Sequence, residues 1–397
     1  MRNARHRLIV PSLAVAIGAS AVGAEPQLID LGVLPGFQQS GVTALSADGS
    51  TVVGFSTADI DGVHFRRAFR WTQASGLAPL APLPGDQNST AIAVCADGTV
   101  AVGVSVSPLP SQTVRAVRWL ADGTVEALPV PLGSRESRAL DVSDDGTVVV
   151  GEVEPPVGWI RPARWTAGGD AELLGDEWSF HQPQAVSADG AVITGHNWDH
   201  DSFCWTASDI HLLESNYKVR MFGLSDDGAV LVGEVAGTPA LWTETDGFQF
   251  LDASLRGGDA LACNSNASLI GGNLQRSHGG AFIWTQHLGL VELREFLEGR
   301  FSAVEWPRFT SVEGISADGT RVSGGTLGNA WILIDLPEHC PGDTQLNGEV
   351  ELLDLQTLLF NFGRTGDATY QHGDCNSDGN VDLDDLQVLL FHFGQTC

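Results

Sequence analysis

The chain has 397 residues, of which 43% are hydrophobic, and its 49 Asp and Glu residues outnumber 21 Lys and Arg residues to give a net charge of -28. This charge excludes nucleic acid and anionic lipid surfaces as electrostatic partners. Because the acidic residues are spread along a chain with ample apolar content, they indicate a folded, highly solvated surface and not a disordered acidic tail.

The first predicted element is a secretory signal peptide over residues 1–24. Arg2, Arg5 and Arg7 precede an apolar stretch, and small residues lead to Ala24, after which we expect cleavage. The stretch is shorter than the roughly 20 residues that a spanning helix needs, and no later segment is apolar for that long. We therefore expect a secreted protein, extracellular or at the cell surface, with no membrane span.

A repeat organises residues 25–336. Five of the seven copies contain Ser, a small or acidic residue, Asp and Gly. Each copy continues as an apolar run that ends in Gly and leads to an aromatic phrase that ends in Trp. The first phrases lie at 44–54, 93–103, 142–151, 185–195, 223–233, 261–271 and 314–324, and the aromatic phrases end at Trp71, Trp119, Trp165, Trp205, Trp242, Trp284 and Trp331. A spacing of about 40 to 50 residues, with Asp-Gly hairpin turns, predicts one four-stranded propeller blade per copy. The sixth copy has Asn266-Ala267 in place of Asp-Gly, and we expect a less regular turn there.

The two ends of the repeat region complement each other. The seventh copy stops after Trp331-Ile-Leu-Ile-Asp335 and lacks the Leu-rich fourth strand, whereas a strand of that kind, from Gln27 to Gly36, precedes the first copy. Pairing of this first strand into the last blade closes the ring and removes two exposed edges that invite aggregation. The sequence therefore predicts an all-β, seven-bladed β-propeller over residues 25–336.

Two aromatic phrases, Arg67-Ala-Phe69 and Gly280-Ala-Phe282, are similar to the His-Ala-Phe phrase of the extracellular HAF repeat family, with the His replaced in both. The resemblance covers the whole repeat region. It implies export and a non-catalytic repeat architecture, and it implies no particular substrate.

Residues 337–397 contain two acidic loops, and the second, from Asp374 to Asp385, has the spacing of a calcium loop. Oxygen-bearing side chains stand at positions 1, 3, 5, 9 and 12, and Gly379 stands at position 6, where such a loop turns sharply. The alternative is an Asp-rich turn like those of the blades, but the blade turns lack the later carboxylates. The expected ligand positions are Asp374, Asn376, Asp378, Asn380, Asp382 and Asp385.

The first loop repeats this spacing from Asp343 to Asp354. Three carboxylates, at 343, 351 and 354, stand where the second loop has four, and Gln345 is longer than the usual Asn or Asp. We expect a second, weaker Ca²⁺ site here, and the alternative is an empty loop that is retained for structure. The candidate positions are Asp343, Gln345, Asn347, Glu349, Glu351 and Asp354.

Each loop runs into a predicted helix that ends at Gly363 or Gly394. Two loop-then-helix units without the entering helix of an EF-hand, and with Asp at position 12, resemble type I dockerin repeats, above all the GC-type dockerin-like anchors of exported bacterial proteins. The resemblance implies a small α-helical calcium-binding module that attaches the propeller to a cohesin-like or other surface receptor. The apolar residues expected to face the module's core are Leu355, Leu358, Leu359, Phe362, Leu386, Leu389, Leu390 and Phe393.

In the dockerin family, loop positions 10 and 11 help to choose the cohesin and are often small hydroxyl residues. Here they are Leu352-Leu353 and Leu383-Asp384, so ordinary cellulosomal cohesin recognition is not expected and the receptor is left open. Phe360 and Phe391 lie off the core stripe. They belong either to a partner face or to a shield over the module's own core.

The six cysteines are too few for a disulfide scaffold. Cys340 and Cys397 bracket the final module, where a disulfide makes structural sense, and Cys375 is then left over. We interpret Cys95 and Cys263, which fall where the repeat has Ser, and Cys204 as small buried side chains.

The sequence favours a non-catalytic exported protein whose propeller binds a polysaccharide, a protein or a wall component. The alternative is a propeller hydrolase or lyase acting on polysaccharide, which needs paired carboxylates or a His or Tyr base at one rim. The most unusual segment for that purpose is His196-Asn-Trp198-Asp199-His200-Asp201, with Trp178 and His181 nearby in sequence. We interpret it as a decorated, exposed loop.

Overall fold

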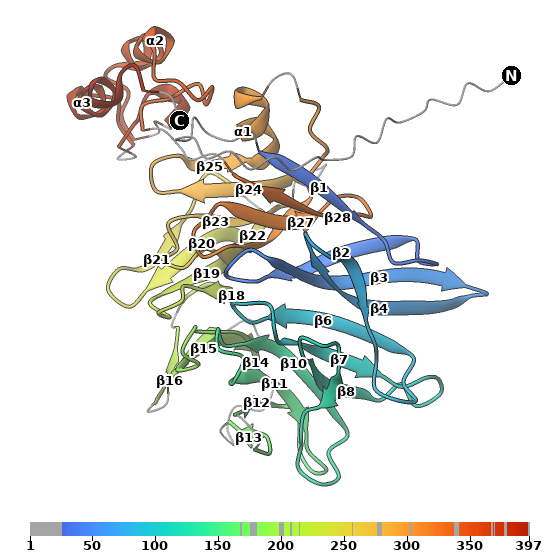
Figure 1. Ribbon diagram of the computed structural model, residues 1–397. Helices are drawn as coiled ribbons and strands as arrows, with labels where there is room; N and C mark the ends of the chain where they lie inside the picture. Colours follow the sequence, from blue (N-terminus) through green and yellow to red (C-terminus); the bar gives the residue numbers. More distant parts are fainter. Residues whose placement is uncertain are drawn as a thin grey trace, which may run out of the picture.

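The computed structural model describes residues 26–166, 169–174, 181–197, 202–206, 209–213, 215–255, 257–275, 280–301, 304–336, 341–366, 368, 370–376 and 379–395. The strands in these residues form seven antiparallel four-stranded sheets that follow one another around a common axis (Figure 1). This arrangement confirms the predicted seven-bladed β-propeller. The predicted signal peptide lies outside the described residues.

The blades follow the chain in order. Blade one contains β2 (Gln39–Leu45), β3 (Thr51–Ile60), β4 (Val63–Thr72) and β5 (Gly76–Leu80), and blade two contains β6 (Asn88–Val94), β7 (Ala101–Val106), β8 (Val114–Trp119) and β9 (Val125–Ala127). Blade three contains β10 (Glu136–Val142), β11 (Val149–Glu154), β12 (Arg161–Trp165) and β13 (Glu172–Leu173), and blade four contains β14 (His181–Val186), β15 (Val192–Asn197), β16 (Ser202–Thr206) and β17 (Asp209–Leu212). Blade five contains β18 (Val219–Leu224), β19 (Val230–Val235), β20 (Thr238–Thr243) and β21 (Gly247–Phe250), and blade six contains β22 (Gly258–Cys263), β23 (Ile270–Leu274), β24 (Gly280–Thr285) and β25 (Gly289–Glu292).

The seventh blade joins the two ends of the propeller. Its inner strands are β26 (Ser311–Ile315), β27 (Arg321–Gly325) and β28 (Ala330–Ile334), and its outer strand is β1 (Gln27–Gly32). Strand β1 pairs antiparallel with β28, with Gln27 opposite Ile334 and Asp30 opposite Trp331. The predicted closure by the N-terminal strand is therefore confirmed, and it leaves β28 with a partner on both sides.

The repeated Ser-x-Asp-Gly phrase forms the turn between the first two strands of a blade. In blade one, the Ser46 hydroxyl donates to Asp48 Oδ1 at 2.6 Å and accepts from the Thr51 N–H at 2.9 Å. Gly49 follows with a φ of +69°, which glycine adopts at little cost. In the blade-three copy, the N–H of Thr147 and the hydroxyls of Ser143 and Thr147 hold the pKa of Asp145 below its ordinary value. Each turn is thus closed by its own side chains.

A ring of backbone hydrogen bonds joins these turns around the axis. The bonds run from Asp48 N–H to Ala96 O, Ala96 N–H to Asp144 O, Asp144 N–H to Ala188 O, Ala188 N–H to Asp226 O, Asp226 N–H to Ser265 O, Ser265 N–H to Ala317 O, and Ala317 N–H to Ala47 O. Their donor–acceptor distances lie between 2.7 and 3.3 Å. The last bond returns to blade one, so the ring is closed.

Blade six corrects two sequence-based expectations. Its turn is regular, because Asn264 Oδ1 accepts from the Leu269 N–H at 2.9 Å as Ser46 does in blade one, and Ala267 takes the glycine position with a φ of +55°. Asn264 therefore replaces the Ser of the repeat. Cys263 is the last residue of β22, opposite Ile270, and not the Ser equivalent.

Cys95 does occupy the Ser position, in blade two. Its Sγ donates to Asp97 Oδ1 at 3.1 Å and accepts from the Val100 N–H at 3.1 Å. This cysteine is buried, as is Cys204, whereas Cys263 is partly exposed. Cys95 is therefore buried, as expected, and it also replaces the hydrogen bonds that Ser makes in the other turns.

Tryptophans on the third strands connect neighbouring blades. Trp119 and Trp165 are buried, and their indole N–H groups donate across the blade boundary to Ala81 O at 2.7 Å and Pro129 O at 2.6 Å. A large ring that also carries a polar contact fixes the distance between two sheets. The Trp of the repeat thus serves packing between blades.

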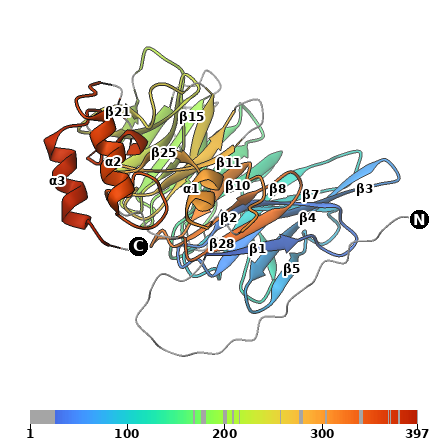
Figure 2. The same cartoon turned by 90° about the horizontal axis from the view of Figure 1, so that it is seen from above.

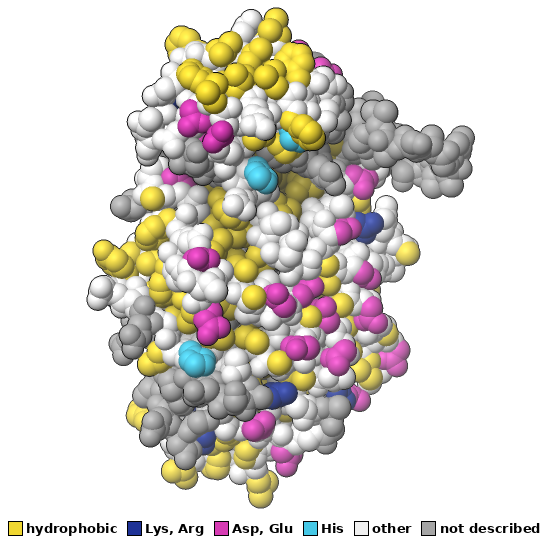
Figure 3. Space-filling view, turned by 90° about the vertical axis from the view of Figure 1, so that its left-hand side faces the viewer, with side chains coloured by type: hydrophobic (Ala, Val, Ile, Leu, Met, Phe, Trp, Pro, Cys, Tyr) yellow, Lys and Arg dark blue, Asp and Glu magenta, His cyan; other side chains and the backbone are white. Residues whose placement is uncertain are grey.

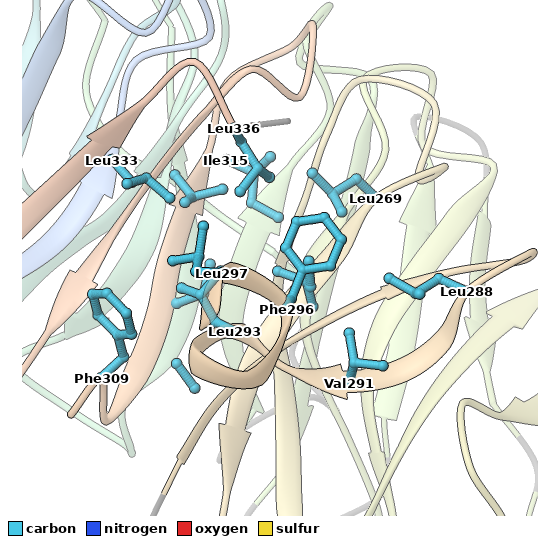
Figure 4. Packing of buried hydrophobic residues seen from close by; sticks show 14 of the residues in the cluster. Leu269, Leu288, Val291, Leu293, Phe296, Leu297, Phe309, Ile315, Leu333 and Leu336 are labelled. Carbon is cyan, nitrogen blue, oxygen red and sulfur yellow. The ribbon is translucent and has the colours of Figure 1, made fainter. Parts of the chain in front are cut away.

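A short helix, α1 (Leu293–Arg300), is inserted between β25 and β26. Leu293, Phe296 and Leu297 point from it into a cluster of buried side chains from blades six and seven (Figure 4). The C-terminal residues form α2 (Leu352–Asn361), a 3-10 turn (Tyr370–His372) and α3 (Leu383–His392), which lie beside α1 at one side of the propeller (Figures 1 and 2). In the part of the chain that the structure describes, no helix is long and apolar enough to cross a membrane.

The turn glycines provide a test of how closely the blades approach each other. Replacement of Gly190 by Ala places a Cβ 2.6 Å from Val148 of the preceding blade at a φ of +73°, so backbone strain and overpacking add up to about 2 to 4 kcal/mol of lost stability. The measurement is chemical denaturation of the two proteins.

Gly319→Ala is the matched control for this change. Its φ is +74°, but the nearest heavy atoms lie 3.5 Å from the added Cβ, so only the backbone strain of about 1 kcal/mol remains. Equal losses for the two variants contradict the blade contact at Gly190.

Candidate functional site

The C-terminal residues form a module of two units that hold each other. Backbone bonds join Val350 of the first loop to Gly394 and Gln395 after α3, and join Val381 of the second loop to Gly363 and Arg364 after α2. Thr365 and Asn380 form a further bridge. The module's own core consists of the buried residues Val350, Leu358, Cys375, Val381 and Leu389.

Glycines before the two loops allow the two units to pack closely against each other. A Cβ on Gly342 comes within 3.0 Å of the α3 backbone at Leu389, and a Cβ on Gly373 comes within 2.5 Å of the α2 backbone at Leu358. Each loop therefore starts directly against the helix of the other unit. Gly363 and Gly394 have φ values of +90° and +81° just after α2 and α3, which confirms them as helix C-caps.

The second loop keeps its first and last carboxylates buried and oriented. Asp374 Oδ2 accepts from the N–H of Gly379 at 2.9 Å, and Gly379 has a φ of +82°. Asp385 Oδ1 accepts from the N–H groups of Cys375 and Asn376 at 2.8 and 3.1 Å, and its Oδ2 accepts from the Asp382 N–H at 2.8 Å. The carboxylates at positions 1 and 12 are thus held by backbone N–H groups of their own loop.

The remaining expected positions of this loop are less complete. Asn380 is described, and its backbone forms the bridge to Thr365, but Asp378 lies outside the described residues. Asp382 also caps α3, since its side chain accepts from the Asp384 N–H. In the described residues, no three His, Cys, Asp or Glu side chains converge on one point. Carboxylate and amide oxygens on a tight glycine turn are nevertheless the donors that Ca²⁺ takes, so the chemistry of this loop fits that ion.

The first loop has the same internal bonds. Asp343 accepts from the N–H of Asn347 on Oδ1 at 3.0 Å and from that of Gly348 on Oδ2 at 2.8 Å. At position 12, Asp354 accepts from the Gln345 N–H at 3.1 Å and the Glu351 N–H at 2.8 Å. The side chains of Gln345 and Glu349 are exposed, and Asn347 Nδ2 donates to Glu351 Oε1 at 3.3 Å.

One contact of the first loop comes from the propeller. Arg300, the last residue of α1, donates from Nη2 to Asp343 Oδ2 at 3.2 Å, and both side chains are buried. Burial raises the pKa of Asp343, although the bond from Gly348 and the charge of Arg300 act to lower it. No feature of the sequence indicates this pair, because the two residues belong to different predicted domains.

The outer faces of α2 and α3 are apolar. Phe360 is 88% exposed and Phe391 is 79% exposed, so neither shields the module's core. The predicted core stripe is only partly right: Leu358 and Leu389 are buried, whereas Leu359, Phe362, Leu390 and Phe393 are each about half exposed. The exposed side chains of both helices form an apolar patch at the module's end of the molecule (Figure 3). The patch consists of Leu359, Phe360, Phe362, Leu383, Leu390, Phe391 and Phe393. On α3, Leu383, Leu386, Leu390 and Phe391 line a hollow of about 420 Å³.

Beside the contact between the module and the propeller lies a cavity of about 540 Å³ that both of them line. The propeller contributes Trp284 and Leu290 from blade six together with Glu292 and Glu295 near the start of α1. The module contributes Tyr370, Asp374 and Gly379. The second loop therefore borders this cavity, whereas the first loop rests on α1.

The structure describes only the first two residues of the segment 196–201, which was the candidate for catalysis. His196 and Asn197 belong to β15, so this end is a strand and not a loop, and the His196 ring packs edge-on against Phe222 of blade five at 5.8 Å. Residues 198–201 and Trp178 lie outside the described residues, and His181 belongs to β14.

Inner strands of blades three to six carry ion pairs that the sequence analysis missed. Arg138 pairs with Glu152 at 2.8 Å and with Glu136 at 2.9 Å, and Gln182 of blade four donates to Glu152 at 3.1 Å. Arg220 pairs with Glu234 and reaches Asp259 of blade six at 3.4 Å. Glu152 and Asp259 thus link neighbouring blades. The available signal was the separation of 14 residues between Arg and Glu, which Arg138–Glu152 and Arg220–Glu234 share.

Of the three cysteines in the module, the structure describes Cys375 alone. Cys375 is a free, fully buried thiol in the module's core, where burial raises its pKa to about 12. Cys340 and Cys397 lie outside the described residues, so their predicted pairing stays a prediction.

Comparison with known proteins shows the fold. No family model matches the chain, and no curated protein does. An oligogalacturonate lyase from Vibrio parahaemolyticus is 12% identical, with a TM-score of 0.53 over 78% of this chain and 94% of its own. The β-propeller domain of Cps50 (Swd1) from Myceliophteria thermophila is 12% identical, with a TM-score of 0.50 over 78% of this chain and 100% of its own. TolB from Acinetobacter baumannii is 11% identical with a TM-score of 0.42, and the match spans 73% of this chain and 64% of TolB. At these identities, the likeness to the lyase and to the Cps50 domain establishes a β-propeller and no activity.

Proposed function

We propose that this chain is an exported, non-catalytic binding protein whose propeller is attached to a surface or extracellular assembly by a calcium-dependent C-terminal module. One observation carries the proposal. The two loop-helix units of the module clasp each other through Val350 and Val381 and leave apolar side chains on the outer faces of both helices. Such an exposed apolar patch on a small module is typical of a protein interaction site.

Calcium enters the proposal through the second loop. The burial of Asp374 and Asp385 supports it, because a bound cation offsets part of the free-energy cost of burying two carboxylates in one loop. Ca²⁺ supplies that charge and binds carboxylates, amide oxygens and a backbone carbonyl together. Calcium bound here would hold the start of α3 and so the position of the apolar patch.

The receptor is best described by the chemistry of the patch. Phe360, Phe391, Leu383 and Leu390 require an apolar, preferably aromatic or aliphatic, surface on a partner protein. This is the kind of contact that a cohesin-like or other surface receptor would make with a dockerin-like module. The predicted signal peptide supports a location outside the cytoplasm.

The ligand of the propeller is proposed only by class. A polysaccharide or a protein suits a closed propeller on an exported chain, because the loops at its rims present a broad and variable surface.

Removal of one carboxylate from the second loop tests the calcium site. Asp374→Asn keeps the side-chain shape but removes a charge, and we expect Ca²⁺ affinity to fall by about tenfold or more, as for lost partners of other metal sites. Isothermal titration of the full chain after chelator treatment measures this. Asp122→Asn, in an exposed hairpin turn of blade two, is the matched control and should leave the affinity unchanged. Equal affinities for the wild-type and Asp374→Asn chains contradict the site.

The apolar patch is tested with surface substitutions. Phe360→Ser with Phe391→Ser removes two exposed rings without touching the core, so the melting temperature should stay the same while binding of the receptor weakens by roughly 30-fold or more. The measurement is capture of surface proteins by the full chain, with and without chelator, followed by identification of the captured protein.

The control for the patch is Leu132→Ser. Leu132 lies in the connection between blades two and three of the propeller and is 97% exposed. Capture that is independent of calcium, or that survives the double substitution, rules out the patch as the attachment site.

A further inference from the structure

The contact between Arg300 and Asp343 joins the propeller to the first loop. The Arg300 side chain is only 2% exposed, and it meets the carboxylate that stands at position 1 of the loop, where a calcium loop binds its ion. Its Nε and Nη1 are buried and have no hydrogen-bond partner in the described residues. Burial of a guanidinium with two unsatisfied nitrogens costs free energy, and the ion pair with Asp343 offsets this cost.

The position of Arg300 is fixed by its own helix. Its Cζ lies 4.4 Å from the centroid of the Phe296 ring, one turn earlier on α1. Phe296, together with Leu293 and Leu297, anchors α1 in the core shared by blades six and seven (Figure 4). The charge is therefore presented by the propeller as a rigid group.

The first loop is shaped to receive α1. Gly299 has no side chain, and a Cβ there would lie 2.8 Å from the carbonyl oxygen of Leu346. Leu346, at loop position 4, has a φ of +58° and buries its side chain in the α1 cluster. Tyr370 joins the same cluster, and its hydroxyl accepts from the Gly342 N–H at 2.7 Å. Backbone and side chains of the module thus lie directly on the helix that carries Arg300.

These residues do not fit Ca²⁺ in the first loop. An ion bound to Asp343 would lie within a few ångströms of a buried guanidinium, and little solvent is available to screen the two positive charges. The loop also has fewer carboxylates at its ligand positions than the second loop. Arg300 already supplies the positive charge that a buried Asp343 requires.

We propose that Arg300 takes the place of calcium in the first loop and fastens the C-terminal module to the propeller, so that the assembled chain binds one Ca²⁺, in the second loop. The stoichiometry rests on the proposed function, whereas the docking role of Arg300 does not. The first loop is then an internal docking site, and α2 and α3 keep a fixed orientation relative to the blades.

Native mass spectrometry and calcium titration of the full chain test the stoichiometry. We expect one ion in the wild type, one ion in Asp343→Asn and none in Asp374→Asn. Two ions in the wild type, or loss of an ion in Asp343→Asn, overturn the proposal. A wild-type chain that binds no calcium refutes the proposed second-loop site, and the docking experiment then decides the role of Arg300.

Hydrogen exchange of the full chain tests the docking. Arg300→Met keeps an apolar stem on Phe296 but leaves Asp343 without its charge partner, so the Asn347 and Gly348 amides should exchange roughly tenfold faster or more. Arg294→Met is the control on the same helix, because Arg294 pairs with Glu298 at the surface, where the side chains are 47% and 44% exposed. Exchange in the first loop that is the same in both variants overturns the docking role of Arg300.

Discussion

Seven hairpin turns meet at one end of the propeller axis, and each donates a backbone N–H to the next. The bond is available because the Ser and Asp side chains close the turn internally, as Ser46 and Asp48 do, and so leave the outer backbone groups free to pair between blades. The last bond, from Ala317 to Ala47, requires blades one and seven to be adjacent. Pairing of β1 with β28 meets the same requirement at the outer edge. Closure at the centre and closure at the edge therefore support each other.

The Ser-x-Asp-Gly turns fix one end of each blade, so an inserted element fits more easily into the connections away from these turns. Helix α1 is such an addition, placed between β25 and β26 and held by Leu293, Phe296 and Leu297. Its insertion leaves the blade order unchanged, since β26 still enters the ring beside blade six. The C-terminal module rests on this addition, so its position depends on α1 and not on the repeat itself.

The sequence predicted what is periodic and missed what depends on three-dimensional packing. Turn spacing gave the number of blades, and the missing strand after Asp335 gave the closure by β1. The helical stripe of the module misplaced Leu359 and Leu390, because a two-helix module buries only a narrow stripe, while periodicity marks every apolar position alike. The Arg300–Asp343 pair joins positions that no repeat or motif relates. The equivalence of Asn264 with Ser was missed because a substituted copy offers two possible alignments.

Three aspartates of this chain, Asp145, Asp343 and Asp374, have different roles, and the roles differ with the burial of the carboxylate. Asp145, in an exposed turn, is satisfied by neighbouring N–H and hydroxyl groups and needs no counter-charge. Asp343 is buried, and in addition to its local N–H bonds it meets a cation, Arg300, which the propeller provides. Asp374 stands at the same loop position and is also buried, but it borders the cavity instead of α1. In our proposal the second loop binds Ca²⁺ from solution through Asp374, so one unit of the module is permanently tied to the propeller and the other responds to calcium.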